Sequence, residues 1–242
     1  MIVVLCALVG WFAGAAIWNV ARNQATRRPL LAGAASDTGT DGMPPVAWLP
    51  LLGLLRARTD PSTGMAQYRW RPIFELATAA YFVIAAAQLG GSSELTTVLV
   101  CSVPLLVMGL VDYWTRLIHS VVVLAGIGVG LLFALQDGPR GLAESALAMV
   151  LAALAFGFFY VMVIVVYKNP KASPFGLGDV YLAAMIGAMV RLDDVVRALF
   201  LGMLISGVIL GGLLLAKVLD RKQTVAYGPY LCLGALLTLV LS

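Results

Sequence analysis

Long apolar stretches separated by short polar ones run through the whole chain. A helix that crosses the hydrocarbon core of a bilayer needs about 20 apolar residues. Eight stretches approach that length: residues 2–21, 73–89, 95–111, 118–135, 142–166, 179–190, 196–216 and 225–241. The sixth is short, and we expect it to begin nearer Pro174 or to be a broken helix. The pattern predicts an all-α protein, a polytopic bundle of about eight transmembrane helices.

The composition favours a membrane protein. Hydrophobic residues make up 61% of the chain and charged residues 12%, against roughly 45–50% and about 25% in soluble domains. These values argue against a soluble globular protein, a disordered chain and a secreted disulfide scaffold. The three cysteines, Cys6, Cys101 and Cys232, lie far apart in apolar stretches without any CxxC pair. We therefore expect buried apolar cysteines and no metal site.

The basic residues gather on one side of the predicted bundle. Thirteen of the sixteen Lys and Arg residues lie in alternate loops, of which the one after the first segment, residues 22–71, is the only long one. Only Arg140, Arg191 and Arg197 lie on the other side. Under the positive-inside rule the basic loops face the cytoplasm and both termini face outward. Since topology explains the net charge of +4, we expect no nucleic-acid partner.

Two acidic residues lie where a membrane protein rarely tolerates charge. Asp112 ends the third segment and Asp179 opens the sixth, so the topology puts both on the cytoplasmic face. Two facing carboxylates would share a proton, and one would act as base and the other as acid on a water, as in an aspartic peptidase. By contrast, Asp137 and Glu144 lie at outer loops, where we expect them to be solvated.

Both aspartates also have structural interpretations. Asp179 could be a helix N-cap, and Asp112 could pair with Arg116 one helical turn further on. Gly176 and Gly178 would let the backbone open and leave room for an extended peptide, although glycines here could equally mark a turn. These residues alone predict a membrane protein with a candidate acidic site, and ion transport stays open.

Five stretches carry motifs: residues 175–187 (FGLGDVYLAAMIG), 112–118 (DYWTRLI), 227–235 (YGPYLCLGA), 50–52 (PLL) and 71–76 (RPIFEL). The first contains a GxGD sequence followed by a helix-forming run with small residues. The second contains the other aspartate, and the third resembles a final-helix pattern with a Gly-Pro pair. Together they resemble the type 4 prepilin peptidase family, aspartic proteases of the GxGD type.

This resemblance implies a membrane-embedded aspartic endopeptidase whose catalytic residues are Asp112 and Asp179. Such enzymes cleave the leader of type IV prepilins or pseudopilins at the cytoplasmic face of the bacterial inner membrane, within the lipid bilayer and without a cofactor. The family motifs assign backbone support or substrate binding to four further residues, Gly176, Gly178, Gly228 and Pro229. The resemblance also implies an N-terminal part, residues 1–90, and a C-terminal aspartic peptidase domain of six spans, residues 91–242.

Many full-length members of that family also methylate the new N-terminus with S-adenosylmethionine, through the N-terminal part. Those members often carry two CxxC pairs in the first cytoplasmic loop, as in a zinc site. Residues 22–71 contain no cysteine, so we expect methylation to be absent. Glu75 matches a family glutamate linked to methylation, but it could equally pair with Arg69 or Arg71.

Other departures and other classes of function stay open. His119 stands where the family usually has proline, and Tyr181 stands where relatives often have lysine; the sequence assigns neither a role. An ion-coupled transporter would bind a cation or proton at helix breaks near mid-membrane. A non-catalytic scaffold would only support pilus or secretion assembly. A presenilin-like protease is disfavoured because its Pro-Ala-Leu tripeptide is missing, and the oligomeric state is not predicted.

Overall fold

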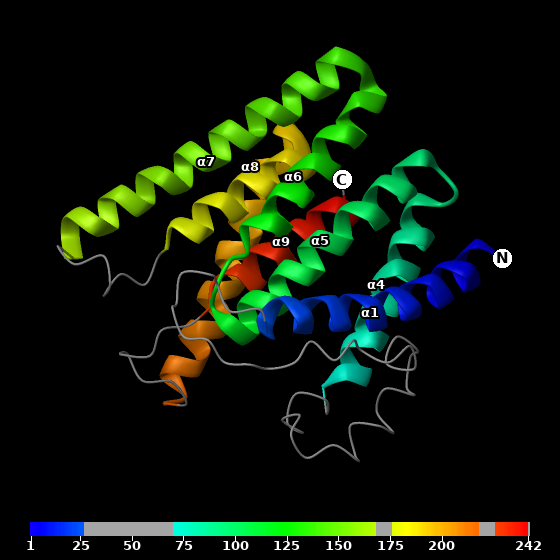
Figure 1. The fold of residues 1–242 in the computed structure, drawn as a ribbon, viewed down its shortest axis with the longest axis horizontal. Coiled ribbons are helices and arrows are strands. Elements are labelled where there is room, and N and C mark those ends of the chain that lie inside the picture. The colour runs from blue at the N-terminus through cyan, green and yellow to red at the C-terminus, as the bar shows by residue number, and fades with distance from the viewer. Residues whose placement is uncertain (27–69, 168–175, 218–225, 242) are drawn as a thin grey trace. The chain divides into compact units, whose positions relative to one another are not determined.

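The computed structural model describes residues 1–26, 70–167, 176–217 and 226–241. Within these ranges every regular element is a helix (Figure 1), which confirms the predicted all-α class. The predicted long loop, residues 22–71, lies almost wholly outside the described residues. The helices are α1 (Ile2–Thr26), α4 (Arg71–Leu89), α5 (Ser93–Thr115), α6 (Ser120–Ala134), the short η2 (Leu135–Asp137), α7 (Gly138–Tyr167), α8 (Leu177–Leu215) and α9 (Gly228–Leu241).

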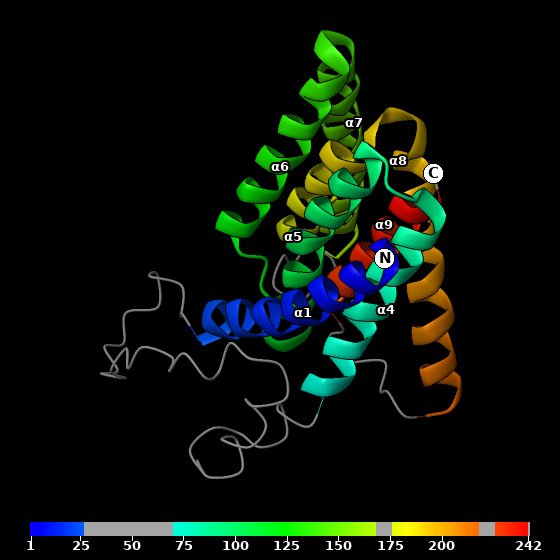
Figure 2. The same cartoon turned by 90° about the vertical axis from the view of Figure 1, so that its right-hand side faces the viewer.

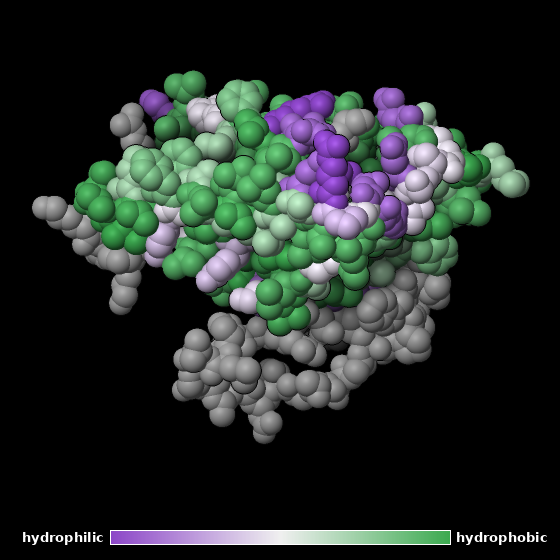
Figure 3. All heavy atoms as spheres, turned by 90° about the horizontal axis from the view of Figure 1, so that it is seen from above, coloured by the Kyte–Doolittle hydropathy of each residue, from purple (hydrophilic) through white to green (hydrophobic). Residues whose placement is uncertain are grey.

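Several of these helices are suited to a bilayer. Five described stretches are long and apolar enough to cross a membrane: Ile2–Arg22, Arg71–Leu89, Ser93–Thr115, Ser120–Val166 and Leu177–Leu215. Hydrophobic side chains also cover most of the face drawn in Figure 3. These features indicate a membrane protein. The count of about eight spans stays a prediction, because α9 is shorter and two of the five stretches are long enough to hold more than one span.

The chain divides into two compact units, Met1–Leu95 and Thr96–Ser242. In the first unit α1 crosses α4 (Figures 1 and 2), and the two helices approach closely at glycines of α1. A Cβ on Gly14 would lie only 2.9 Å from the Cα of Glu75, and Gly10 makes a contact of the same kind. Small residues allow such backbone contact between membrane helices.

In the second unit the first half of α8, residues 177–190, packs against α6 and α7. A Cβ on Gly130 of α6 would lie 2.6 Å from the carbonyl oxygen of Ala188. On the other side, a Cβ on Gly187 would lie 2.6 Å from the carbonyl oxygen of Ala148 in α7. Because backbone meets backbone on both sides, neighbouring helices fix this half of α8 closely.

A break divides α8 into two halves that pack on different neighbours. Arg191 has φ 70° and ψ 178°, a conformation that is nearly confined to glycine. After this break the second half, residues 192–215, packs on α9, where a Cβ on Gly202 would lie 2.7 Å from the Cα of Leu231. The sixth predicted segment therefore begins at Leu177 and meets the seventh at Arg191.

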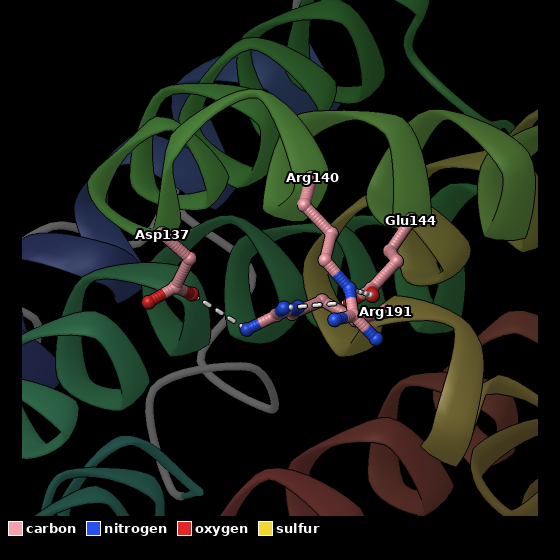
Figure 4. A network of polar contacts seen from close by, with 4 residues as sticks. All are labelled: Asp137, Arg140, Glu144 and Arg191. Atoms are coloured by element: carbon pink, nitrogen blue, oxygen red, sulfur yellow. Dashed lines mark hydrogen bonds and ion pairs between the residues drawn. The ribbon is translucent and has the colours of Figure 1, made fainter.

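Charged side chains surround this break (Figure 4). Arg191 donates from Nη1 to Oδ2 of Asp137 over 2.6 Å and from Nη2 to Oε2 of Glu144 over 2.8 Å. Glu144 also accepts a hydrogen bond from Nε of Arg140 over 2.9 Å. Both acids keep exposed surface, as expected, but they also pair with Arg191, because the break in α8 brings this arginine to the turn between α6 and α7.

Candidate active site

Asp112 lies in the last turn of α5 with its side chain buried. Its Oδ2 accepts a hydrogen bond over 3.0 Å from the backbone N–H of Gly228, the first residue of α9. A Cβ on Gly228 would lie 2.5 Å from this oxygen, so only glycine permits the approach. Pro229 comes next, at a helix start where a missing N–H costs no helical hydrogen bond. The start of α9 therefore holds Asp112 in place.

Asp179 lies in the first turn of α8 and is also buried. The N-cap is Gly176, whose extended backbone (φ −109°, ψ 160°) precedes the helix. The N–H of Gly176 donates to Oδ2 of Asp179 over 2.9 Å. The interpretation of Asp179 as the N-cap residue is therefore wrong. Its carboxylate instead bonds back to the N-cap from three residues further on, as the acidic residue of a capping box does.

The two aspartates, 67 positions apart in the sequence, come together in the structure. Their carboxylates lie close enough for their charges to repel each other. Two contacts join the segments that carry them. Gly228 lies against Leu182 of α8, since a Cβ there would lie 3.2 Å from Cδ2, and Gly178 lies against Ile118, shortly after α5. The end of α5 and the starts of α8 and α9 therefore converge on one site.

Each carboxylate keeps one oxygen uncommitted. In the part of the chain that the structure describes, Oδ1 of neither Asp112 nor Asp179 accepts a hydrogen bond, and neither side chain forms an ion pair. Arg116 attracts Asp112 electrostatically but from beyond ion-pair distance. The predicted close pairing with Arg116 is therefore wrong. Two neighbouring acids with free oxygens can share a proton and polarise a water between them.

The two glycines before Asp179 differ in their surroundings. A Cβ on Gly178 would lie 3.0 Å from Cβ and Cδ1 of Ile118, so this side chain fills the room that we expected for a peptide. A Cβ on Gly176 would meet nothing nearer than 3.8 Å, so the space beside Gly176 stays open. Ile118 ends one of the motif stretches, but its contact with Gly178 could not be predicted, because no local signal indicates a contact across 60 residues.

His119 and Tyr181 lie near the site in sequence. His119 is the N-cap of α6 and half-buried, and its Nδ1 is buried without a hydrogen-bond partner among the described residues. Tyr181 follows Asp179 by two residues and exposes half of its surface. Within the described ranges no hydrogen bond joins either side chain to the two carboxylates. The structure thus assigns neither of them a role.

Glu75 belongs to a buried ion pair of the first unit. Nε of Arg71 lies 2.7 Å from its Oε1, with the two side chains 0% and 1% exposed. Nε1 of Trp11 donates to Oε2 over 3.3 Å. The interpretation that Glu75 pairs with Arg71 is confirmed, whereas Arg69 lies outside the described residues. Both oxygens of this carboxylate therefore have protein partners in the first unit.

The described residues offer no cluster of metal ligands. Over residues 1–26, 70–167, 176–217 and 226–241, no three His, Cys, Asp or Glu side chains are grouped as a metal site requires. The cysteines Cys6, Cys101 and Cys232 are buried free thiols, as their apolar surroundings in the sequence predicted.

Comparison with known proteins finds one similar family. Residues 99–216 match the model of the Type IV leader peptidase family. No curated protein and no solved structure gives a match. The matched range holds both aspartates and the helices that pack around the first half of α8, which is the part of the molecule that builds most of the site. Residues 99–216, just under half of the chain, are therefore similar to the type IV leader peptidase family.

Proposed function

We propose that the chain is a membrane-embedded aspartic endopeptidase that cleaves the leader of type IV prepilins or pseudopilins. The observation that carries this proposal is the meeting of Asp112 and Asp179, which are buried together with one oxygen of each left free. Two buried like charges repel each other and weaken a fold, so a role in chemistry explains them better than a role in stability. The family match supplies the class of reaction.

The mechanism follows from a proton shared between the two carboxylates. The ionised carboxylate takes a proton from a water molecule as the water oxygen attacks the scissile carbonyl carbon. The protonated carboxylate donates its proton to the carbonyl oxygen. Collapse of the tetrahedral intermediate breaks the C–N bond. The carboxyl group that took the proton from water gives it to the leaving nitrogen, and the other carboxylate takes back the proton of the hydroxyl group as the new carboxyl group forms. The N–H groups of Gly176 and Gly228 hold each Oδ2, which leaves each Oδ1 for water and substrate.

Aromatic residues support a position at the membrane surface. Tyr and Trp concentrate at the boundary between hydrocarbon and water. Five lie close to the helix ends that form the site: Tyr113, Trp114, Tyr181, Tyr227 and Tyr230. Together with the charge asymmetry of the loops, they lead us to place the pair at the cytoplasmic face of a bacterial inner membrane, with both termini outside.

The surroundings of the site suit a substrate with an apolar helix. Tyr113, Leu117, Leu177 and Tyr181, all near one of the aspartates in sequence, are exposed. These side chains would contact the hydrophobic N-terminal helix of a prepilin. The net charge of +4 does not favour a basic leader, so apolar contact would supply most of the affinity. The peptide bond must be unwound before a water can reach it.

The test is cleavage of a prepilin precursor by the full chain in lipid vesicles. Asp112→Asn and Asp179→Asn should each lower kcat by about 10²–10⁴-fold, the usual loss on removing a general acid or base. Asp193→Asn is the matched control on α8, because its carboxylate is exposed, and it should cleave at the wild-type rate. Normal cleavage by either aspartate variant, correctly inserted, would contradict the proposal.

We also propose that the chain does not methylate the product. The loop over residues 22–71 has no cysteine, and the Glu75 carboxylate is already bonded by Arg71 and Trp11. Mass spectrometry of the processed pilin, after incubation with S-adenosylmethionine, should show an unmodified N-terminus. An added methyl group that depends on this chain would contradict this part of the proposal.

A further inference from the structure

The turn after α5 is held in a fixed relation to Asp112. The N–H of Arg116 donates to the carbonyl oxygen of Asp112 over 2.8 Å, and Arg116 adopts φ 54°. Oγ1 of Thr115 donates to the carbonyl oxygen of Val111 over 2.8 Å and accepts from the N–H of Leu117 over 3.2 Å. These bonds leave the turn little freedom to move independently of the carboxylate.

Ile118 follows this turn and lies against the backbone at the start of α8. A Cβ on Gly178 would lie 3.0 Å from Cβ and Cδ1 of Ile118 and 3.2 Å from Cγ1. Non-bonded carbon atoms pack best at about 3.5–4.0 Å, so Ile118 already occupies the space of a side chain at position 178. In sequence, Ile118 is six residues from Asp112, and Gly178 directly precedes Asp179. One side chain thus connects the two carboxylate-bearing segments.

We propose that Ile118 is a positioning residue that sets the separation between the carboxylates of Asp112 and Asp179. This inference deepens the proposed function and rests on it. Ile118 is fixed to α5 through the turn on one side and packs on the backbone of α8 on the other, so it acts as a spacer. Both acids must reach the same water, and a misplacement of about 1 Å can lower a rate by about 100-fold.

A size-exchange experiment tests the spacer in the full chain, in vesicles, with a prepilin precursor. Gly178→Ala adds a methyl group where Ile118 lies and should lower kcat by about tenfold or more, with KM changed by less than about twofold. Ile118→Ala removes Cγ1, Cγ2 and Cδ1 and should also lower kcat. The double variant should recover about threefold or more over Gly178→Ala, because the two changes compensate in volume.

Two further variants keep the test decisive if Gly178→Ala does not fold. Ile118→Val removes only Cδ1, so its loss of kcat should be smaller than that of Ile118→Ala; an equal or larger loss would overturn the spacer. Val121→Ala is the matched control, because Val121 lies three residues further on and is exposed. Its cleavage rate should equal that of the wild type.

The outcomes separate the spacer from the proposed function. If the wild type cleaves and the loss of kcat in the double variant equals the product of the two single losses, the role of Ile118 as a spacer is overturned. The proposed peptidase function is then unaffected. If the wild type does not cleave, the proposed function fails, and with it the role of Ile118 in catalysis. In that case thermal unfolding of the wild type, Gly178→Ala, Ile118→Ala and the double variant still tests the contact between Ile118 and Gly178. Compensating changes in volume give unfolding midpoints that are not additive.

Discussion

The first half of α8 carries a different arrangement of charge at each of its ends. At its start, Asp179 is buried near Asp112, and neither carboxylate has an ion-pair partner within the described chain. At its end, Arg191 binds Asp137 and Glu144, and all three side chains are partly exposed. Like charges repel at the first end, whereas opposite charges attract at the second.

Under the proposed function, the start of this half of α8 serves chemistry and its end serves structure. Burying carboxylates without a cation weakens a fold, so the pair at the start of α8 has to be retained for another reason. The ion pairs of Arg191 compensate for the strained backbone at this residue. Because the side chains are partly exposed to solvent, other contacts could replace these ion pairs. Substitutions of the aspartates at the start should therefore lower cleavage without lowering stability. Substitutions of the ion pairs at the end should lower stability without lowering cleavage.

Asp112→Asn and Asp137→Asn should differ most clearly in their effects on cleavage and on the unfolding midpoint. Asp112→Asn should lower cleavage by about 10²–10⁴-fold without lowering the thermal unfolding midpoint, because the amide removes the repulsion from Asp179 and still accepts from Gly228. Asp137→Asn should leave cleavage unchanged and lower the midpoint, because it removes an ion pair of Arg191. If Asp112→Asn lowered the thermal unfolding midpoint clearly below that of the wild type, the two ends would not differ in this way.

A smaller but still large effect is expected from Gly228→Ala. The new Cβ would lie 2.5 Å from Oδ2 of Asp112 and must displace that carboxylate or the start of α9. We expect cleavage to fall by about 100-fold, the usual cost of a shift of about 1 Å in a catalytic group. Gly207→Ala on α8 is the control, because its Cβ would meet no atom within 4 Å. Equal rates for the two variants would show that the Gly228 contact is not required.

At the other end, two variants of Arg191 separate backbone strain from charge. Arg191→Gln keeps a side chain at φ 70° and loses both ion pairs, so it should destabilise the protein. Arg191→Gly loses the same ion pairs but removes a strain of about 1–3 kcal/mol. Chemical unfolding should therefore find the Gly variant more stable than the Gln variant by about that amount. Equal stabilities would mean that the backbone here is not strained.

The sequence predicted what depends on local pattern. Apolar length gave the places of the helices, and the polar interruption between the sixth and seventh segments marked the break that the structure places at Arg191. The parity of the segments also predicts that Asp112 and Asp179 lie on one face of the membrane. Each of these inferences needs only the order of residues along a helix and the thickness of a bilayer.

The contacts that build the site could not be predicted in this way. Gly228 bonds to Asp112 across 116 positions, and Ile118 meets Gly178 across 60. Such contacts depend on how helices pack, and the pattern of apolar residues along one helix does not indicate which helix lies beside it. The same limit explains why the sequence did not predict the ion pair between Glu144 and Arg191.

The smallest effect should come from Arg140→Gln. The Arg140 side chain is 91% exposed and pairs only with Glu144, one turn along α7. Exposed pairs of this kind contribute little, and salt screens them, so the unfolding midpoint should stay unchanged at physiological salt. Glu144→Gln should lower it more, because Arg191 then loses one of its two carboxylates. If Arg140→Gln lowered the unfolding midpoint as much as Arg191→Gln, exposed ion pairs would contribute as much stability as partly buried ones. Exposure would then no longer distinguish the charges near Arg191 from the buried aspartates.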